Sequence, residues 1–407
     1  MAIKWLKNSM KNEVSSALEY FTIEEAEKAL KFHKSIYRYS VTPLHSLASL
    51  SEHFNVKNIY LKDESIRFEE ESFKSLGRTY AMGKILSERI GKDISDVSFG
   101  YFYIPEVKAI TQEITFATAT DGGFGVPVSW AAKEIGHKAM VYATSNVSRY
   151  QIEMIQKEGA EVKVFDKPYS EVIVELLKDA QKNAWEVVQD TTWKTGKNIP
   201  VWIMQGYMTL MLEVKETFEK IGESAPTHIF VQAGLGSLAA SVIGLIKNSL
   251  PKNMPKIILV ENENDSSIYY SAQKADGTPH SEFEGTESLE LKALGLSHGA
   301  INEVAWDVIK SHADYFFRCS KEVHARGMRI LASVKESPIT SGASGGLTMG
   351  LLSLLLENDK YCDIKSELEL GLESRILLIN TEGLSDPKYF REVVWDGKHS
   401  SLEEHCK

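Results

Sequence analysis

A single lysine, Lys74, lies in residues 72–77, between an extended segment at residues 60–65 and a run with the apolar period of a helix. The amine of a lysine at such a position can form a Schiff base with an aldehyde. The short motif alone is weak evidence, because most lysines that open a helix are solvated surface groups. Other polar residues along the chain decide between these two interpretations.

A glycine-rich turn at residues 232–237 follows the apolar run 229–231 and opens another helical run. Four residues of this turn are candidate phosphate ligands: Gly234, Leu235, Gly236 and Ser237. Backbone N–H groups that no side chain shields can surround a phosphate at the start of a helix, whose dipole favours the negative charge. A plain tight turn accounts for the two glycines equally well. The turn is not a dinucleotide fingerprint, because a third glycine and a following acidic residue are not convincingly placed.

Two aspartates stand at the ends of β-rich runs. Asp121 lies in a loop where Gly122 and Gly123 leave a backbone that can approach a ligand closely. Asp190 ends the run at residues 187–189. Carboxylates in such places can move protons. An isolated Asp-Gly pair is more often a helix cap or a turn, and a turn is also the plain interpretation of Asp190.

Two further loops offer neutral hydroxyl groups, from Ser341 in residues 339–346 and from Thr381 in residues 380–383. If the ligand of such a site is a cofactor with a pyridine ring, a neutral hydroxyl partner leaves the ring nitrogen unprotonated. An unprotonated ring nitrogen favours β-elimination or β-replacement over transamination. Each of these hydroxyls could equally cap a helix, and for Ser344 in the same loop capping is the better explanation.

The lysine, the glycine turn and the two aspartates form a coherent set for pyridoxal phosphate chemistry. In that chemistry the lysine binds the aldehyde and the turn holds the phosphate. The carboxylates move protons at the substrate's Cα and at its leaving group. The set therefore predicts an enzyme that acts on a small amino acid.

Strands alternate with helices from about residue 114 onward, which predicts a parallel sheet flanked by helices. The predicted strands are residues 114–119, 139–143, 161–165, 185–189, 228–232, 257–260, 315–318 and 376–380. The predicted helices are residues 126–135, 150–158, 169–183, 202–221, 238–247 and 305–312, with two more after residues 321 and 345. Ligands of open α/β sheets collect at the carboxyl ends of the strands, where the candidate residues lie. The polar stretch 264–290 is predicted to be a surface excursion.

The composition favours small-molecule chemistry. With 407 residues and 43% apolar content, the chain can bury one large or two medium cores. The 46 basic and 56 acidic residues give a net charge of −10 without a block of like charges, which argues against a nucleic-acid or anionic-membrane partner. Three distant cysteines indicate neither a disulfide framework nor a zinc site, and they fit a reducing cytoplasm. Residues 1–12 have no continuous apolar core and read as neither a signal peptide nor a membrane span.

These motifs resemble the fold-type II, tryptophan-synthase-like family of pyridoxal phosphate enzymes. Residues 42–44, 60–65 and 73–74 follow the opening pattern of that family. Within it the chain is most similar to the diaminopropionate ammonia-lyases, from about residue 35 to about residue 400. The most specific similar stretches are residues 119–122, 185–191, 199–207 and 391–399.

The resemblance implies a β-elimination in amino-acid catabolism that converts 2,3-diaminopropionate to pyruvate and ammonia. Lys74 would hold the cofactor and abstract the Cα proton of one stereoisomer. Asp121 would be the base for the opposite stereoisomer, and Asp190 would assist near the substrate. An amine is a poor leaving group unless it is protonated, so a nearby acid is required whatever the family.

The expected architecture is a two-domain α/β fold, in which each domain is a mostly parallel twisted sheet flanked by helices. We expect residues 1–86 and 213–407 to form a large cofactor-binding domain and residues 87–212 to form a small α/β domain. The cofactor is expected in the cleft between them. A homodimer is implied by the resemblance alone.

The chain departs from the lyase pattern at three places. Gly123 and Phe124 stand where the lyases usually have asparagine and histidine, Ala343 replaces a glutamate, and residues 384–385 replace an Asp-Thr pair. Loss of the asparagine amide removes a hydrogen bond worth roughly 0.5–1.5 kcal/mol, so we expect the rate to change more than the binding of the cofactor.

These departures keep other functions open. One is a related pyridoxal phosphate lyase, dehydratase or β-replacement enzyme that acts on another β-substituted amino acid. Another is a catalytically weak homologue that only binds the cofactor. A nicotinamide-dependent protein would explain the glycine turn, but it leaves Lys74 and the two aspartates without a role.

Overall fold

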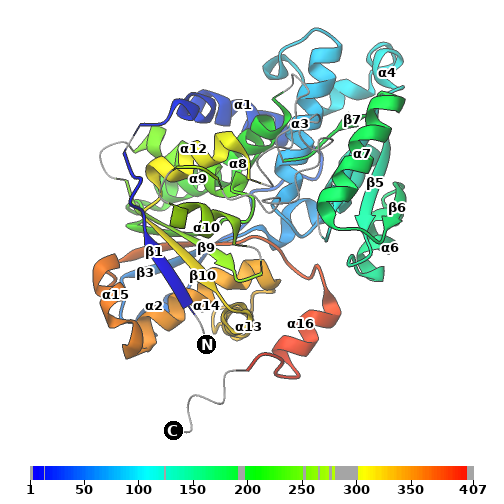
Figure 1. Ribbon diagram of the computed structural model, residues 1–407. Coiled ribbons are helices and arrows are strands. Elements are labelled where there is room, and N and C mark those ends of the chain that lie inside the picture. Colours follow the sequence, from blue (N-terminus) through cyan, green and yellow to red (C-terminus); the bar gives the residue numbers. More distant parts are fainter. Residues whose placement is uncertain are drawn as a thin grey trace.

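The computed structural model describes residues 3–12, 14–122, 125–190, 198–250, 254–264, 266–274, 277–279 and 301–400. This part of the chain forms two sheets with helices packed on them (Figure 1). The α/β fold predicted from the sequence is therefore confirmed.

The larger sheet has seven strands in the order β1-β10-β9-β8-β11-β3-β2. Neighbouring strands are parallel from β10 to β3, whereas the edge strands β1 and β2 are antiparallel to their neighbours. The bounds of its strands are β1 Ile3–Lys7, β2 Leu44–Ser46, β3 Asn58–Asp63, β8 His228–Gln232, β9 Lys256–Asn262, β10 Tyr315–Cys319 and β11 Arg375–Asn380.

The central strand β8 shows why this sheet is parallel and covered on both faces. Ile229 and Val231 pack into the apolar core on one face, and Phe230 between them packs into the core on the other face. All three side chains are fully buried. A strand buried on both faces needs a continuous apolar run, which is typical of parallel sheets between two layers of helices.

Helices form a layer on each face of this sheet (Figure 1). One layer contains α1 Ile23–Lys34, α8 Ile199–Ile221, α9 Ser237–Ser249, α10 Ser267–Lys274 and α12 Glu303–His312. The other layer contains α2 Ala48–His53, α13 Lys321–Ala332, α14 Ala343–Glu357 and α15 Cys362–Leu368, and α16 Pro387–Val394 packs on α13. Short 3₁₀ helices lie at η1 Ser16–Phe21, η2 Glu64–Glu69, η3 Ile94–Asp96, η4 Phe99–Tyr103 and η5 Asp359–Tyr361.

The smaller sheet has four strands in the order β6-β5-β4-β7, all parallel. Its strands are β4 Thr115–Thr120, β5 Lys138–Thr144, β6 Glu161–Phe165 and β7 Glu186–Val187, and the helices of this region are α4 Pro105–Thr111, α5 Gly125–Glu134, α6 Arg149–Lys157 and α7 Tyr169–Asn183. Helix α3, Lys74–Arg89, packs against both α5 and α8, so it lies between the two sheets.

Two glycines allow α3 and α8 to cross at close range. A Cβ atom on Gly206 would lie 2.7 Å from the carbonyl oxygen of Leu76 and 2.8 Å from Cα of Gly77. A Cβ atom on Gly77 would lie 2.5 Å from Cε1 of Tyr207. Any larger residue at either position would push the helices apart. Because α3 begins at Lys74, the position of Lys74 depends on this close crossing.

Each strand predicted after residue 114 is present with its ends within two residues of the prediction, and the predicted helices are present too. The edge strands β1 and β2 were not predicted. The expected ends of the small domain, residues 87 and 212, fall inside α3 and α8, so those boundaries stay a prediction. Most of the polar stretch 264–290 lies outside the described residues.

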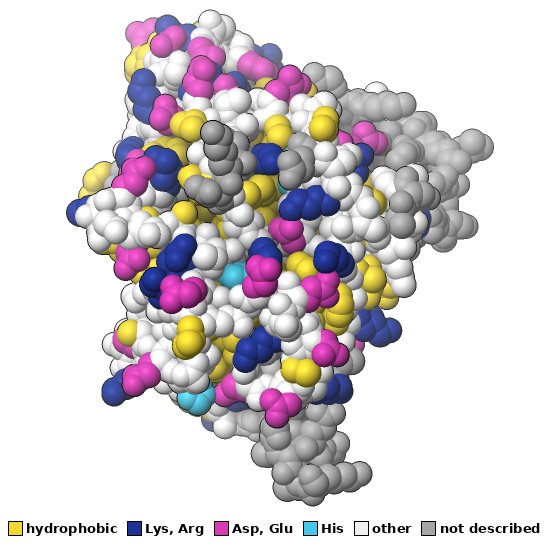
Figure 2. Space-filling model, turned by 90° about the vertical axis from the view of Figure 1, so that its left-hand side faces the viewer, with side chains coloured by type: hydrophobic (Ala, Val, Ile, Leu, Met, Phe, Trp, Pro, Cys, Tyr) yellow, Lys and Arg dark blue, Asp and Glu magenta, His cyan; other side chains and the backbone are white. Residues whose placement is uncertain are grey.

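Charges of both signs are interspersed over the face of the molecule drawn in Figure 2. In the described ranges, no helix has the length and apolar content needed to cross a membrane. Over the same ranges, no three His, Cys, Asp or Glu side chains come together as a metal site.

Candidate active site

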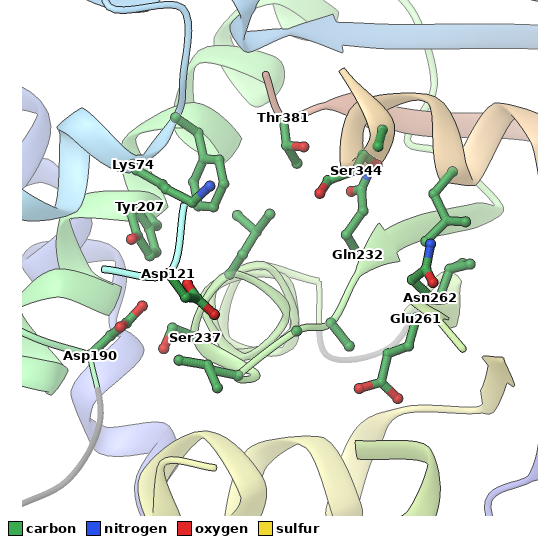
Figure 3. A pocket seen from close by; sticks show the side chains of 18 of the residues that line it. Lys74, Asp121, Asp190, Tyr207, Gln232, Ser237, Glu261, Asn262, Ser344 and Thr381 are labelled. Atoms are coloured by element: carbon green, nitrogen blue, oxygen red, sulfur yellow. The ribbon is translucent and has the colours of Figure 1, made fainter. Parts of the chain in front are cut away.

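A cavity of about 460 Å³ opens at the carboxyl ends of β8, β9 and β11. Residues that follow β4 and β7 of the smaller sheet also line it, so the cavity lies between the two sheets. In Figure 3, Lys74, Tyr207, Asp121 and Asp190 occupy one side of it, and Gln232, Ser344, Glu261 and Asn262 the other. This location is the one expected for a ligand site in a parallel α/β fold.

Lys74 is the first residue of α3, and it lines the cavity. The segment before it runs antiparallel to the chain after β11. The N–H of Phe73 donates to the carbonyl of Thr381 at 3.2 Å, and the N–H of Gly383 donates to the carbonyl of Glu71 at 2.9 Å. These backbone bonds fix the start of α3, and with it Lys74, beside the carboxyl end of β11.

Asp121 and Asp190 line the same cavity but differ in their surroundings. Asp121 is exposed, whereas only 4% of Asp190 is exposed. Asp190 Oδ2 lies 3.3 Å from Nη2 of Arg78, and Asp190 Oδ1 is buried without a hydrogen-bond partner in the described structure. Asp121 can therefore exchange protons with solvent, whereas Asp190 is a buried carboxylate held in one orientation.

Tyr169, the first residue of α7, lines the cavity close to both aspartates. Burial raises the pKa of Tyr169 well above its ordinary value of 10, and the negative charges of Asp121 and Asp190 raise this pKa further. The phenol is therefore protonated at neutral pH. Nε2 of Gln189 donates to its oxygen at 2.5 Å, which leaves the phenol proton available for another acceptor.

The predicted phosphate turn lies between β8 and α9. Gly234 and Gly236 have φ angles of +48° and +90°, a conformation that favours glycine. Gly234, Leu235 and Ser237 line the cavity, and a Cβ atom on Gly234 would meet nothing within 4 Å. Gly236 does not line it, because it faces α12, where a Cβ atom would lie 3.0 Å from Cδ1 of Ile309.

The predicted hydroxyl groups separate into two kinds. Thr381 lines the cavity, is 2% exposed, and its Oγ1 has no hydrogen-bond partner in the described structure. Ser341 is buried outside the cavity lining, and its Oγ donates to the carbonyl of Gly342 at 3.0 Å. Of the two candidates, Thr381 is therefore the one placed to meet a ligand. Gly122 is not among the lining residues, and Gly123 lies outside the described residues.

The structure adds polar residues that the sequence did not single out. Nε2 of Gln232 donates to the carbonyls of Ser344 and Ile379, at 2.8 and 2.9 Å, and so joins β8 to α14 and β11. The carboxylate of Glu261 accepts from the first N–H groups of α10, which holds that helix at the rim. Both residues stand at strand ends, a signal that was available. Tyr207 and Arg78 come from helix interiors, and although Tyr207 ends the similar stretch 199–207, neither residue was a candidate for the site.

The residues of this cavity fit pyridoxal phosphate. The start of α9 and the unpartnered Oγ of Ser237 suit an anionic phosphate. The unpartnered hydroxyl of Thr381 suits a neutral ring nitrogen, and Lys74 supplies an amine for the aldehyde. Buried hydroxyls without partners cost free energy unless a ligand satisfies them, so their presence in one cavity indicates a ligand site.

Fold and site together define a pyridoxal phosphate enzyme, and the chain belongs to the family of pyridoxal-phosphate dependent enzymes, whose model matches residues 37–368. Its cofactor is pyridoxal phosphate. The chain is similar to the diaminopropionate ammonia-lyase of Salmonella typhimurium, with 37% identity over 401 residues that cover 97% of this chain and 98% of the relative.

Two solved structures of the Escherichia coli diaminopropionate ammonia lyase match over 98% of both chains. The complex with D-serine gives a TM-score of 0.88 at 35% sequence identity. The complex with an aminoacrylate–PLP azomethine reaction intermediate gives a TM-score of 0.86, also at 35% identity. The resemblance drawn from the sequence motifs is therefore confirmed.

Proposed function

We propose that this protein is an ammonia-lyase that converts 2,3-diaminopropionate and water to pyruvate and two molecules of ammonia. One observation carries the proposal. Lys74, Asp121 and Asp190 line a single cavity in a chain that matches a diaminopropionate ammonia-lyase over nearly its whole length.

The cofactor, when bound, supplies an electron sink for the charge that develops at the substrate's Cα. Lys74 would hold its aldehyde, and Gly234, Leu235 and Ser237 would hold its phosphate. Thr381 would supply a neutral hydroxyl partner for the ring nitrogen. Each of these assignments rests on the residue's place in the cavity lining.

Protons are moved by the chain's own side chains. The amine of Lys74 takes the proton from Cα of one stereoisomer, and the carboxylate of Asp121 takes it from Cα of the other. Asp190 would hold the substrate's ammonium groups and assist departure of the β-nitrogen as ammonia, a role supported by its place in the cavity lining and by an Oδ1 without a partner in the described structure. Asp121 is the more exposed carboxylate, which suits a base that exchanges its proton with solvent.

The decisive experiment supplies each stereoisomer of 2,3-diaminopropionate to the purified enzyme and measures pyruvate and ammonia. We expect two ammonia molecules per pyruvate, whereas a serine or threonine dehydratase releases one ammonia per keto acid. Lys74→Ala should remove turnover, and Lys157→Ala, at the exposed end of α6, should not. Absence of turnover on both stereoisomers would reject the proposal.

A second candidate function is elimination or replacement on another β-substituted amino acid. It is favoured by Ala343, which lines the cavity where the lyases usually carry a glutamate. Profiling β-substituted and β-hydroxy amino acids separates the two candidates, since the second one predicts a better substrate than 2,3-diaminopropionate.

We further propose a cytoplasmic homodimer. The three distant cysteines support a reducing compartment, and the dimer rests on the family resemblance. Light scattering of the purified protein measures the oligomeric state.

A further inference from the structure

Arg78 is a buried cation at the edge of the candidate active site. It lies one helical turn after Lys74 on α3, on the same side of the helix, and only 1% of it is exposed. Its guanidinium makes two separate contacts with residues of the cavity. Nη2 lies 3.3 Å from Oδ2 of Asp190, and Nη1 donates to the hydroxyl oxygen of Tyr207.

The first contact orients the carboxylate of Asp190. Its Oδ2 is held by Arg78, and its backbone carbonyl accepts from Nδ2 of Asn302 at 3.4 Å. Its Oδ1 is buried and has no hydrogen-bond partner among the described residues, and Asp190 is one of the residues that line the cavity. An unpaired carboxylate oxygen in a buried place is costly unless a ligand supplies the donor. The substrate's ammonium groups are donors of the right charge.

The second contact orients Tyr207. Because its oxygen accepts from Arg78, the phenol proton must point elsewhere. Tyr207 lines the cavity, and its ring centroid lies 4.8 Å from that of Phe73, the residue before Lys74. The guanidinium also stands 5.9 Å from the centre of the Tyr207 ring. One cation therefore fixes a proton acceptor and a proton donor of the same cavity.

We propose that Arg78 is a positioning residue of the elimination, which orients Asp190 so that Oδ1 faces the ammonium of the substrate and orients the Tyr207 hydroxyl toward the cavity. This inference rests on the proposed function. The planar fork of arginine is needed because it binds two partners in different directions, whereas the ammonium of a lysine is a single point of charge. Arg78→Lys therefore keeps the charge and removes the geometry.

A double-mutant cycle on kcat distinguishes a positioning role of Arg78 from a purely structural one. We expect Arg78→Lys and Asp190→Asn each to lower kcat about 100-fold, because small displacements of reacting groups have effects of this size. The double variant should lose little more than Asp190→Asn alone, beyond the smaller factor that Tyr207→Phe shows, since Arg78 acts mainly through Asp190. Losses that multiply, to about 10,000-fold, would overturn the proposal.

Control variants separate an effect on positioning from effects on folding and on cofactor binding. Tyr207→Phe removes the hydroxyl and keeps the ring packing, and it should lower kcat by a smaller factor than Arg78→Lys. Arg89→Lys, at the half-exposed end of the same helix, should leave kcat unchanged. The absorbance band of the bound cofactor should be the same in every variant, because Lys74 is intact.

Urea unfolding of the cofactor-free protein gives a readout that does not depend on turnover. The midpoint shifts of Arg78→Lys and Asp190→Asn should be non-additive in the double variant, which would support a direct interaction between the two side chains. Additive shifts would overturn it. A wild-type enzyme that releases no pyruvate would reject the proposed function, and the orientation of Asp190 by Arg78 would then be judged by these midpoints alone.

Discussion

His33 lies with its Nε2 atom 2.9 Å from the carbonyl oxygen of Leu76, two residues after Lys74. Its other ring nitrogen, Nδ1, is 2.8 Å from Oγ1 of Thr209 on α8. A neutral ring that donates from Nε2 and accepts at Nδ1 satisfies both partners. The imidazole is completely buried and joins α1, α3 and α8 at the point where Lys74 is positioned.

This histidine should make the protein less stable in mild acid. Burial lowers the pKa of His33 from 6.5 to about 3, despite the hydrogen bond to Leu76. The unfolded chain takes up a proton below pH 6.5 and the folded chain does not, so stability is complete above pH 6.5 and falls as the pH drops toward 3. His33→Gln keeps both hydrogen bonds and does not titrate.

Urea unfolding between pH 6.5 and pH 5 measures this contribution. The unfolding free energy of the wild type should fall more steeply than that of His33→Gln, by a slope difference that approaches about 1.4 kcal/mol per pH unit near pH 5. The difference between the two slopes isolates His33 from the other buried histidines. Parallel slopes would show that the ring is protonated, or solvated, in the folded protein.

The helix crossing beside Lys74 should be intolerant of one added methyl group. Gly206→Ala places a Cβ atom 2.7 Å from the carbonyl oxygen of Leu76, so α3 or α8 must shift. We expect a loss of about 1–3 kcal/mol in unfolding free energy and weaker binding of the cofactor, because Lys74 moves with α3. Gly371→Ala, where a Cβ atom meets nothing within 4 Å, is the matched control and should cause no loss. Equal stabilities of the two variants would contradict the crossing.

Local patterns in the sequence predicted the parts of the site that belong to short strand-to-helix connections. Lys74 and the turn containing Gly234 could be found because each lies between a strand and a helix, and because several weak signals of this kind together fit one cofactor. The residues at strand ends could be found because parallel strands bring their carboxyl ends to one edge.

Residues that meet only through tertiary packing could not be found in this way. Arg78 and Tyr207 are 129 positions apart and converge because two glycines let α3 and α8 cross closely. No local pattern encodes that crossing. The choice between Ser341 and Thr381 also depended on packing, because both hydroxyls lie in loop segments of the sequence and only that of Thr381 belongs to a residue that lines the cavity. The strand β1 was missed because it is a five-residue edge strand with no buried residue.

A second buried ion network should dominate the stability of the region before Lys74. Glu213 on α8 lies 2.5 Å from Nζ of Lys62 and 2.7 Å from Nη2 of Arg67, and these side chains are completely buried. Although burial alone raises the pKa of Glu213, the Arg67 guanidinium and the Lys62 ammonium hold it well below its ordinary value of 4.5. The carboxylate is therefore charged at neutral pH and, together with the buried Glu64, which lies 2.8 Å from Nη2 of Arg67, it balances two buried cations.

Glu213→Gln removes the carboxylate that Lys62 and Arg67 share and leaves Arg67 with Glu64 alone, so we expect it to cost about 3–5 kcal/mol in unfolding free energy. The control is Glu216→Gln, three residues along the same helix, where a half-exposed carboxylate lies 3.7 Å from Lys34. That change should cost less than about 1 kcal/mol. Urea unfolding compares the two, and similar small losses would mean that water reaches the network.

The hydroxyl of Thr381 should lower the stability of the cofactor-free protein and strengthen binding of the cofactor. Its Oγ1 is buried without a partner in the described structure, so Thr381→Val replaces an unsatisfied hydroxyl by a methyl group of nearly the same size. Cofactor-free Thr381→Val should therefore be more stable than the wild type, by about 1 kcal/mol, because the cost of burying the hydroxyl is removed.

The loaded enzyme should respond in the opposite direction. If the hydroxyl meets the ring nitrogen, Thr381→Val loses one hydrogen bond, and the affinity for pyridoxal phosphate should fall about tenfold. Thr381→Ser keeps the hydroxyl and should retain most of the affinity. Absorbance titration of the cofactor into the apoenzyme measures both variants. A Thr381→Val protein that is less stable without cofactor yet binds it normally would place the hydroxyl in the scaffold and leave the ring nitrogen to another residue.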